Sequence, residues 1–135
     1  MDLMESLMIS AAGMRAQGQR LRVVAENLAN ADSVAEVPGG DPYRRKTITF
    51  KNQLDRELGM ETVQVSKVGE DPSDFRMKYD PGNPAADGKG YVKLPNVNSL
   101  IEMTDMREAQ RSYEANLRAI EVARSMLQRT IDLIR

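Results

Sequence analysis

The sequence predicts a mainly α protein, in which an N-terminal and a C-terminal helix form an antiparallel coiled-coil stem around a short irregular and β-hairpin middle segment. All six Pro and every Gly except Gly13 and Gly18 lie between residues 31 and 98. The two Pro-free ends repeat apolar residues every seven positions, as helices do when they pack along one side. We therefore divide the chain into residues 1–30, 31–98 and 99–135.

The N-terminal helix is expected over residues 3–29. Asp2 can cap it, and Glu5 lies three residues further on, as in a capping box. Its heptad positions are Leu7, Met14, Leu21 and Leu28. Asn30 is expected to end the helix in the left-handed conformation, which Asn tolerates better than most residues.

The C-terminal helix is expected over residues 99–134, with Ser99 and Glu102 as a second capping box. Its heptad positions are Met106, Tyr113, Ile120, Leu127 and Ile134, and the stripe is widened by Leu117 and Ile131. A helix of about 36 residues is about 54 Å long. This length exceeds that of most globular helices and favours a coiled coil or a helical array.

The middle segment contains few large apolar residues. Its strand candidates are Thr47–Phe50, Glu61–Val68 and Tyr91–Leu94, of which Glu61–Val68 alternates polar and apolar residues most clearly. The sequences PGGDP, EDPSD and DPGNPAADGKG are expected to form turns or loops because Gly, Pro, Asn and Asp favour them.

Each helix also has a second apolar edge. On the C-terminal helix it comprises Ala115, Ala119, Val122, Met126 and Leu133, and on the N-terminal helix Ile9, Ala12, Ala16 and Val23. A helix that is apolar on two sides must be covered on two sides, and one partner helix covers only one. Two interpretations fit this pattern: a bundle closed as a dimer or tetramer, and an open assembly. In either case we expect the helix ends of the free monomer to fray and to fold on joining neighbours. Gly13 and Gly18 are interpreted as points of close helix–helix approach.

Composition excludes several classes of function. The chain has no Cys and no His, so disulfides, thiolate nucleophiles and the commonest metal ligands are absent. A net charge of −1 gives no field that would hold nucleic acid. No apolar run reaches the roughly 20 residues of a membrane span, and Asp2 and Glu5 stand where a secretory signal carries positive charge. We therefore expect no cofactor, no metal and no catalytic site.

Two segments resemble a known family. The N-terminal run SAAGMRAQGQRLRVVAENLANADS contains Asn27-Leu28-Ala29-Asn30-Ala31-Asp32-Ser33, and the C-terminal run RSYEANLRAIEVARSMLQRTIDLI carries Tyr113, Ala115 and Asn116. Both are similar to the rod, hook and filament-joining family of flagellar axial proteins. The stretches PYRRK and DPGNPAADGKGYVKLPNVN resemble a proximal-rod member of that family. Asp41 and Asn83 depart from its usual loop pattern.

The resemblance implies a structural subunit of the flagellar rod that packs helically and carries torque. It implies export through the flagellar type III apparatus without a cleaved signal, and assembly in the periplasm. It also implies contacts with other rod proteins, with the rod-base adaptor FliE and with further copies of the chain. A coiled-coil adaptor that forms one small complex is the alternative.

The residues expected to serve assembly and packing are the heptad positions together with three further pairs of residues. Asn27 and Asn30 are either ordinary helix-end residues or hydrogen-bond donors to a neighbouring chain. Leu117 widens the stripe of the last helix and Asn116 lies on its flank. Asn116 is either exposed to solvent or buried, and a buried Asn there can fix register. Arg44 and Arg45 lie in a basic loop that is either solvated or bound to an acidic neighbour; only Tyr43 is adjacent, so nucleic acid is not expected.

Overall fold

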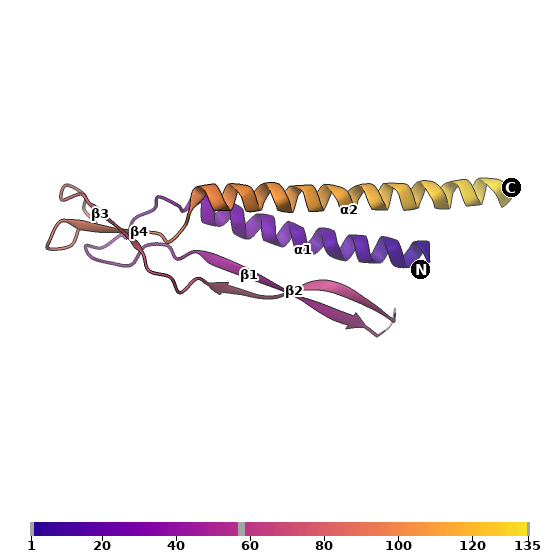
Figure 1. Ribbon diagram of the computed structural model, residues 1–135, viewed down its shortest axis with the longest axis horizontal. Helices are drawn as coiled ribbons and strands as arrows, with labels where there is room; N and C mark the ends of the chain where they lie inside the picture. Colours follow the sequence, from indigo (N-terminus) through magenta and orange to yellow (C-terminus); the bar gives the residue numbers. More distant parts are fainter. Residues whose placement is uncertain (1, 57–58, 135) are drawn as a thin grey trace. The chain divides into compact units, whose positions relative to one another are not determined.

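The computed structural model describes residues 2–56 and 59–134 (Figure 1). Helix α1 covers Leu3–Ala29 and helix α2 covers Ser99–Ile134. Within the described residues the chain between them forms strands β1 (Lys46–Asp55), β2 (Met60–Glu70), β3 (Arg76–Tyr79) and β4 (Tyr91–Leu94). The predicted fold class, mainly α with a β-hairpin middle, is confirmed, and both helices have the predicted bounds.

The chain forms two compact units, and each takes a part of both helices. The first, which we call the terminal unit, consists of Met1–Leu21, Ile48–Lys67 and Arg107–Arg135. The second, which we call the loop unit, consists of Arg22–Thr47 and Val68–Met106. In each unit the segments of α1 and α2 run antiparallel (Figure 1).

The ends of the helices differ in part from the prediction. At the start of α1, Glu5 Oε2 accepts the Asp2 N–H at 2.9 Å, as in a capping box. The expected left-handed conformation of Asn30 is wrong, because no described residue other than Gly has a positive φ. Instead the Asn30 side-chain amide donates to the Glu26 carbonyl at 2.8 Å, and Ser33 donates to the Asn30 carbonyl.

The predicted Ser99–Glu102 capping box of α2 is also wrong. Asn98 caps this helix, since its Oδ1 accepts the N–H groups of Leu100 at 3.1 Å and Ile101 at 3.4 Å. Glu102 does not turn back to the cap, because its carboxylate is buried among residues from elsewhere in the loop unit.

In the terminal unit α1 and α2 pack through small side chains. A Cβ atom built on Gly13 would lie 2.8 Å from Asn116 Nδ2, whereas nothing outside its own helix lies within 4 Å of the same point on Gly18. Gly13 therefore marks a close approach as predicted, and the prediction for Gly18 is wrong. The buried residues of the two helices in this unit are Ser10, Ala12, Gly13, Ala16, Ala109 and Ala123.

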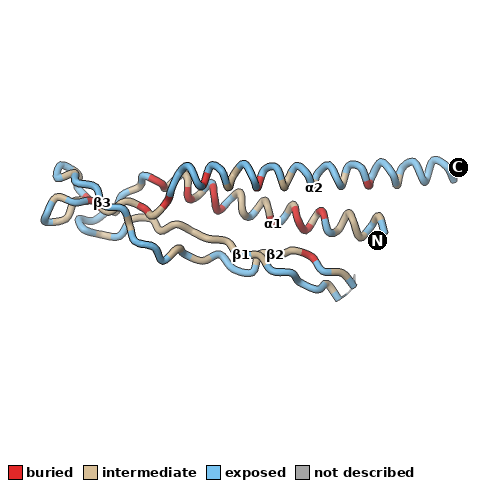
Figure 2. Tube along the Cα trace, viewed as in Figure 1, coloured by how far each residue is buried: buried red, intermediate tan, exposed pale blue. Residues whose placement is uncertain are grey.

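The predicted heptad stripes lie beside these small residues. All four heptad residues of α1 are half-buried, as are Met106, Tyr113, Ile120 and Leu127 of α2. The separation of two helices depends on the side chains at their contact. Small residues at the centre bring the helices close, so the larger side chains pack at the flanks. In Figure 2 the buried positions on both helices alternate with half-buried and exposed ones.

The second apolar edge has a different outcome on each helix. On α1, Ala12 and Ala16 are buried and line a shallow groove together with Val63 and Val65 of β2. The chain's own hairpin therefore covers this edge at these residues, and the expectation that another chain must cover them is wrong.

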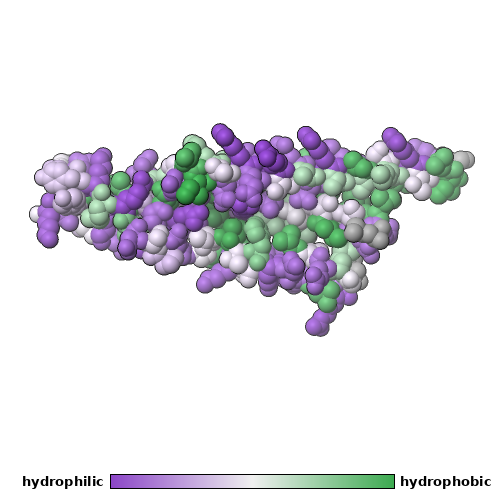
Figure 3. Space-filling view, viewed as in Figure 1, coloured by the Kyte–Doolittle hydropathy of each residue, from purple (hydrophilic) through white to green (hydrophobic). Residues whose placement is uncertain are grey.

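On α2 the second edge is open. Val122 is 53 %, Met126 51 % and Leu133 87 % exposed, and Ile134 at the helix end is 81 % exposed. Hydrophobic surface accordingly appears along the C-terminal part of α2 in Figure 3. The described residues of one chain thus leave a row of large apolar side chains in water.

The strands form two two-stranded sheets, β1 with β2 and β3 with β4. All three strand candidates are confirmed, but β3 was not predicted. It is four exposed residues long, and antiparallel pairing with β4 holds it, with Arg76 opposite Leu94 and Tyr79 opposite Tyr91. The two tyrosine rings meet edge to face at 5.2 Å. Gly90 has a φ of +83° and leaves room for Tyr79, since a Cβ atom there would lie 2.9 Å from its ring.

Candidate assembly surface and the polar cluster of the loop unit

The side chain of Asn27 lies inside the loop unit, near the end of α1, and is 1 % exposed. Its Nδ2 donates to the Lys46 carbonyl at 2.9 Å and to Glu102 Oε2 at 3.2 Å. Its Oδ1 accepts the Lys46 N–H and the Tyr43 hydroxyl, both at 2.8 Å. All four hydrogen-bonding positions of the amide are filled. Asn27 was expected either to be an ordinary helix-end residue or to bond a neighbouring chain. The structure shows all of the hydrogen bonds of its amide within its own chain.

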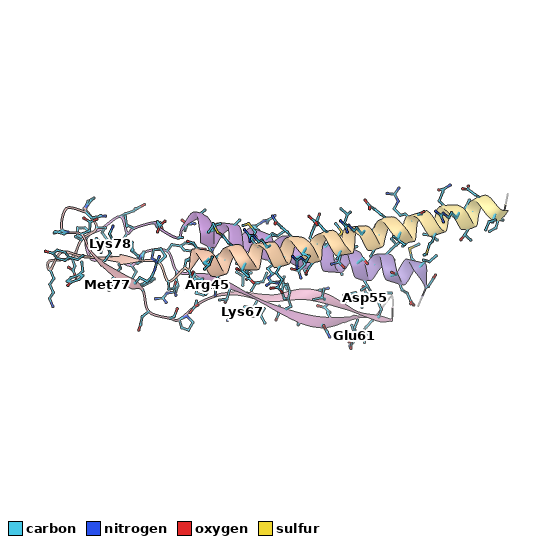
Figure 4. All side chains as sticks on the ribbon, turned by 45° about the horizontal axis from the view of Figure 1, so that its top comes forward. Arg45, Asp55, Glu61, Lys67, Met77 and Lys78 are labelled. Carbon is cyan, nitrogen blue, oxygen red and sulfur yellow. The ribbon has the colours of Figure 1, made fainter. Side chains whose placement is uncertain are left out.

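Glu102, in the first turn of α2, has a fully buried side chain. It accepts the Nε–H of Arg45, and Arg45 also lies 3.5 Å from Asp71. A buried carboxylate is tolerated only when it is paired and hydrogen-bonded, and Arg45 and Asn27 supply both conditions. Figure 4 shows Arg45 beside the first turns of α2. We call Asn27, Tyr43, Arg45, Lys46 and Glu102 the Asn27 cluster.

Tyr43 connects the loop before β1 to this cluster. Burial raises the pKa of Tyr43 to about 12, and the negative charges of Glu26, Glu102 and Glu70 contribute in the same direction. Both causes disfavour the phenolate, so the hydroxyl stays a hydrogen-bond donor to Asn27. Lys46 pairs in turn with Glu26 on α1 at 2.5 Å.

Arg44 is held by a second set of contacts. Its guanidinium lies 4.3 Å from the ring centre of Phe75 and donates to the carbonyl groups of Asp71 and Ser73. The basic loop that was expected to be solvated or bound to another chain is thus bonded within the loop unit through both arginines.

Two loop carboxylates are stabilised in the charged form. Hydrogen bonds from Ser73, with a further contribution from Arg45, lower the pKa of Asp71. The N–H groups of Tyr91 and Lys89 lower the pKa of Asp87. Both aspartates organise turns: Asp71 Oδ1 accepts the Ser73 N–H at 2.9 Å, and Asp87 Oδ1 accepts the Lys89 N–H at 2.8 Å.

The remaining predicted residues lie at the surface of α1 and α2. Asn30 is half-buried and bonds to its own helix. Asn116 is half-buried at the contact with Gly13, and its amide donates to the Ser112 carbonyl at 3.0 Å. Leu117 and Ile134 are exposed.

Two apolar grooves follow the contact of the helices in the terminal unit. One is lined by α1 residues Leu3 and Ser6 and by α2 residues Arg118, Ala119, Val122, Ala123 and Met126. The other is lined by Ala11, Met14, Arg15, Gly18, Tyr113 and Ile120. The heptad residues Met14, Tyr113 and Ile120 therefore form a surface depression together with Gly18. Gly18 lines this depression and does not lie at the close helix contact that had been predicted.

The sequence did not single out Glu102 or Tyr43 as members of a buried cluster. Glu102 was predicted to belong to a capping box, and Tyr43 was noted only as the aromatic residue next to the basic loop. One signal was present: Glu102 begins the series Glu102, Met106, Ala109 and Tyr113, whose spacing of three to four residues continues the packed side of α2. A carboxylate on the packed side of a helix indicates a buried ion pair.

No three His, Cys, Asp or Glu side chains among residues 2–56 and 59–134 are placed to share a metal ion. Neither α1 nor α2, over the part that the structure describes, contains an apolar stretch that could span a membrane. What the described surface does offer is long helices with exposed apolar side chains.

A surface of this kind is typical of a structural subunit. Residues 89–133 match the family described as "Flagellar basal body rod FlgEFG protein C-terminal". The chain is 57 % identical to flagellar basal-body rod protein FlgC of Agrobacterium fabrum over 94 % of its length and 91 % of that protein. It is 44 % identical to FlgC of Escherichia coli O6:H1 and 42 % identical to FlgC of Yersinia enterocolitica, over 98 % of both chains in each comparison.

The chain accordingly belongs to the flagellar basal-body rod protein FlgC family. The resemblance stated from the N- and C-terminal motifs is thereby confirmed. The family is structural, and its members are components of the flagellar basal-body rod.

Proposed function

We propose that this chain packs helically with further rod proteins to form the proximal part of the drive shaft that transmits motor torque. The observation that carries the proposal is the open edge of α2, where Val122, Met126 and Leu133 are each at least half exposed. Burying an apolar side chain of this size is worth about 1.5–3 kcal/mol. Neighbouring subunits that cover this edge would gain that energy at every contact.

Stiffness in such a shaft would come from helices that interlock within and between chains. Contacts between different surfaces of successive subunits generate a helical array when the rotation between subunits does not close a ring. The open edge of α2 with the groove beside Leu3 and Ser6 supplies one such surface in the terminal unit, and the groove beside Met14 and Tyr113 supplies another. The predicted packing residues at Leu7, Met14, Leu21, Leu28, Leu117, Leu127 and Ile134 belong to the same proposal.

The partners proposed are the other rod proteins, the rod-base adaptor FliE and further copies of the chain. Export through the flagellar type III apparatus without a cleaved signal, followed by assembly in the periplasm, completes the proposal.

Val122→Asp tests the role of the α2 edge, with Ser125→Asp as the matched control because Ser125 is also exposed on α2. Both variants add one carboxylate to the same helix. We expect Val122→Asp to abolish rod formation and swimming in a strain that lacks the native chain, while Ser125→Asp retains both. Normal swimming with Val122→Asp would contradict the proposal.

A coiled-coil adaptor that forms one small complex is the alternative function. Sedimentation and electron microscopy over a range of concentrations, with the other rod proteins present, separate the two. Growing polymers support the shaft subunit, and a single discrete complex at all concentrations supports the adaptor.

A further inference from the structure

The outer edge of β1 carries main-chain groups that β2 does not use. The Asp71 N–H donates to the Arg45 carbonyl and the Gly59 N–H to the Asp55 carbonyl, both at 2.8 Å. The Thr62 hydroxyl donates to the Gln53 carbonyl at 3.4 Å. Successive residues of a strand direct their main-chain groups to opposite edges. The odd-numbered residues of β1 therefore face β2, and the even-numbered residues face outward.

Asn27 already occupies the first outward position. Its side-chain amide accepts the Lys46 N–H at 2.8 Å and donates to the Lys46 carbonyl at 2.9 Å. This is the pair of hydrogen bonds that one residue of an adjacent antiparallel strand would make. The edge of β1 is thus capped at its start by a side chain that imitates a peptide group.

The next outward positions are Ile48, Phe50, Asn52 and Leu54. Across residues 2–56 and 59–134, their N–H and C=O groups make no hydrogen bond outside the sheet. Asn52 and Leu54 also have exposed side chains. An open strand edge of this length is a template for pairing with another extended chain, and a two-stranded sheet is marginally stable by itself.

The outer edge of β2 is a matching partner. It is 11 residues long against 10 for β1, so the two strands can pair along most of their length. The charges are complementary as well. β1 carries Lys46 and Lys51 with one carboxylate, Asp55, whereas β2 carries Glu61 and Glu70 with one ammonium group, Lys67 (Figure 4 labels Asp55, Glu61 and Lys67).

We propose that the outer edge of β1 pairs, strand against strand, with the outer edge of β2 of a second copy of this chain. The inference rests on the proposed packing of copies and names one contact within it. Pairing of β1 with β2 joins two different surfaces, so each copy keeps one free edge on which the contact can repeat. Pairing of β1 with β1 would close a two-fold dimer and bring Lys51 of both copies together, which opposes it electrostatically.

Asn52→Pro tests the contact. Pro removes an outward N–H, which edge strands tolerate, and it blocks the incoming strand. We expect this variant to keep the circular dichroism of the native chain in dilute solution and to self-associate at least tenfold more weakly in sedimentation. Asn52→Thr is the control, because it keeps the N–H, and it should associate like the native chain. Equal association of the Pro and Thr variants would overturn the inference.

Amide exchange gives a readout that does not depend on a substitution. The N–H groups of Ile48, Phe50, Asn52 and Leu54 should exchange at least tenfold more slowly in concentrated than in dilute native chain. Free exchange of these four amides at every concentration would overturn the inference.

Cross-linking identifies the partner strand, since the native chain has no Cys. Mixed Asn52→Cys and Gln64→Cys chains should form a disulfide between the two variants. A disulfide only between Asn52→Cys chains would instead indicate β1 against β1 and overturn the inference. Rods that form with Asn52→Pro but not with Val122→Asp would reject the strand contact alone and leave the proposed function standing.

Discussion

Asn27 and Glu102 lie 75 positions apart in the chain and share a hydrogen bond of 3.2 Å, with both side chains at 1 % exposure or less. This bond joins the last turns of α1 to the first turn of α2. Arg45 and Tyr43 complete the cluster from the loop before β1. The loop unit is therefore organised around polar groups, whereas the terminal unit is organised around alanine and glycine.

Arg45→Met tests the buried ion pair. The Glu102 carboxylate is fully buried, and removing its charged partner from such a pair costs about 3–5 kcal/mol of unfolding free energy. Arg45 is partly exposed, so we expect the lower end, about 3 kcal/mol, in urea unfolding followed by circular dichroism. In the double variant Arg45→Met with Glu102→Leu the carboxylate is gone as well. The double variant should lose less unfolding free energy than the sum of the losses of the two single variants. Strict additivity would show that Arg45 and Glu102 are uncoupled.

Gly13→Ala and Gly18→Ala form a matched pair on one helix. Ala is favoured over Gly in a helix by about 1 kcal/mol, and nothing outside its helix lies near Gly18. Gly18→Ala should therefore raise the unfolding free energy by about that amount. Gly13→Ala should gain less or lose stability, because its methyl group would meet Asn116 at 2.8 Å.

Asn116→Ala provides the check on Gly13, since it removes the amide that the new methyl group would meet. Adding it should restore the helix gain of Gly13→Ala in the double variant. If Gly13→Ala and Gly18→Ala stabilise the chain equally, the helices do not approach at Gly13.

Tyr43 makes the loop unit sensitive to alkali. Its pKa is about 12 in the folded chain, against about 10 for an ordinary tyrosine. Between these values the unfolded chain has lost the phenolic proton and the folded chain still binds it, so stability falls as the pH rises from about 10 to about 12. Ultraviolet titration should show one tyrosine that ionises late, and Tyr43→Phe should remove that step.

The Tyr43 hydroxyl should also be measurable at neutral pH. Tyr43→Phe deletes the hydrogen bond to Asn27 and is expected to cost about 1 kcal/mol of unfolding free energy. Tyr79→Phe is the control, since Tyr79 is exposed and no hydroxyl bond of Tyr79 occurs among the described hydrogen bonds. Equal stability of the two variants would contradict the role of Tyr43 in the cluster.

The sequence predicted the elements well and the contacts less well. Helix bounds followed from Pro, Gly and capping residues, which act locally, and both helices and three strands were placed correctly. On the packed side of α1, Gly13 was predicted as a close approach, but Ser10 was missed because it is small and large residues such as Leu7 and Met14 dominate an apolar periodicity. β3 was missed because a four-residue strand owes its form to the opposite strand β4.

The polar cluster illustrates a different limit. Asn27 was singled out by its motif, but its partners are up to 75 residues away, and no local pattern gives such distances. For the same reason Arg44 and Arg45 were interpreted as a basic loop that is either solvated or bound to an acidic neighbour. Their partners Phe75 and Glu102 become adjacent only when the middle segment folds back onto the helix ends within the loop unit.

The most direct test of the central claim is a density map of an intact basal body from electron microscopy, resolved to side chains. We expect the row formed by Val122, Met126 and Leu133 of this chain to lie beneath a neighbouring subunit, with little of it left in contact with water. A map in which that row faces solvent, with subunits joined elsewhere, would contradict the account.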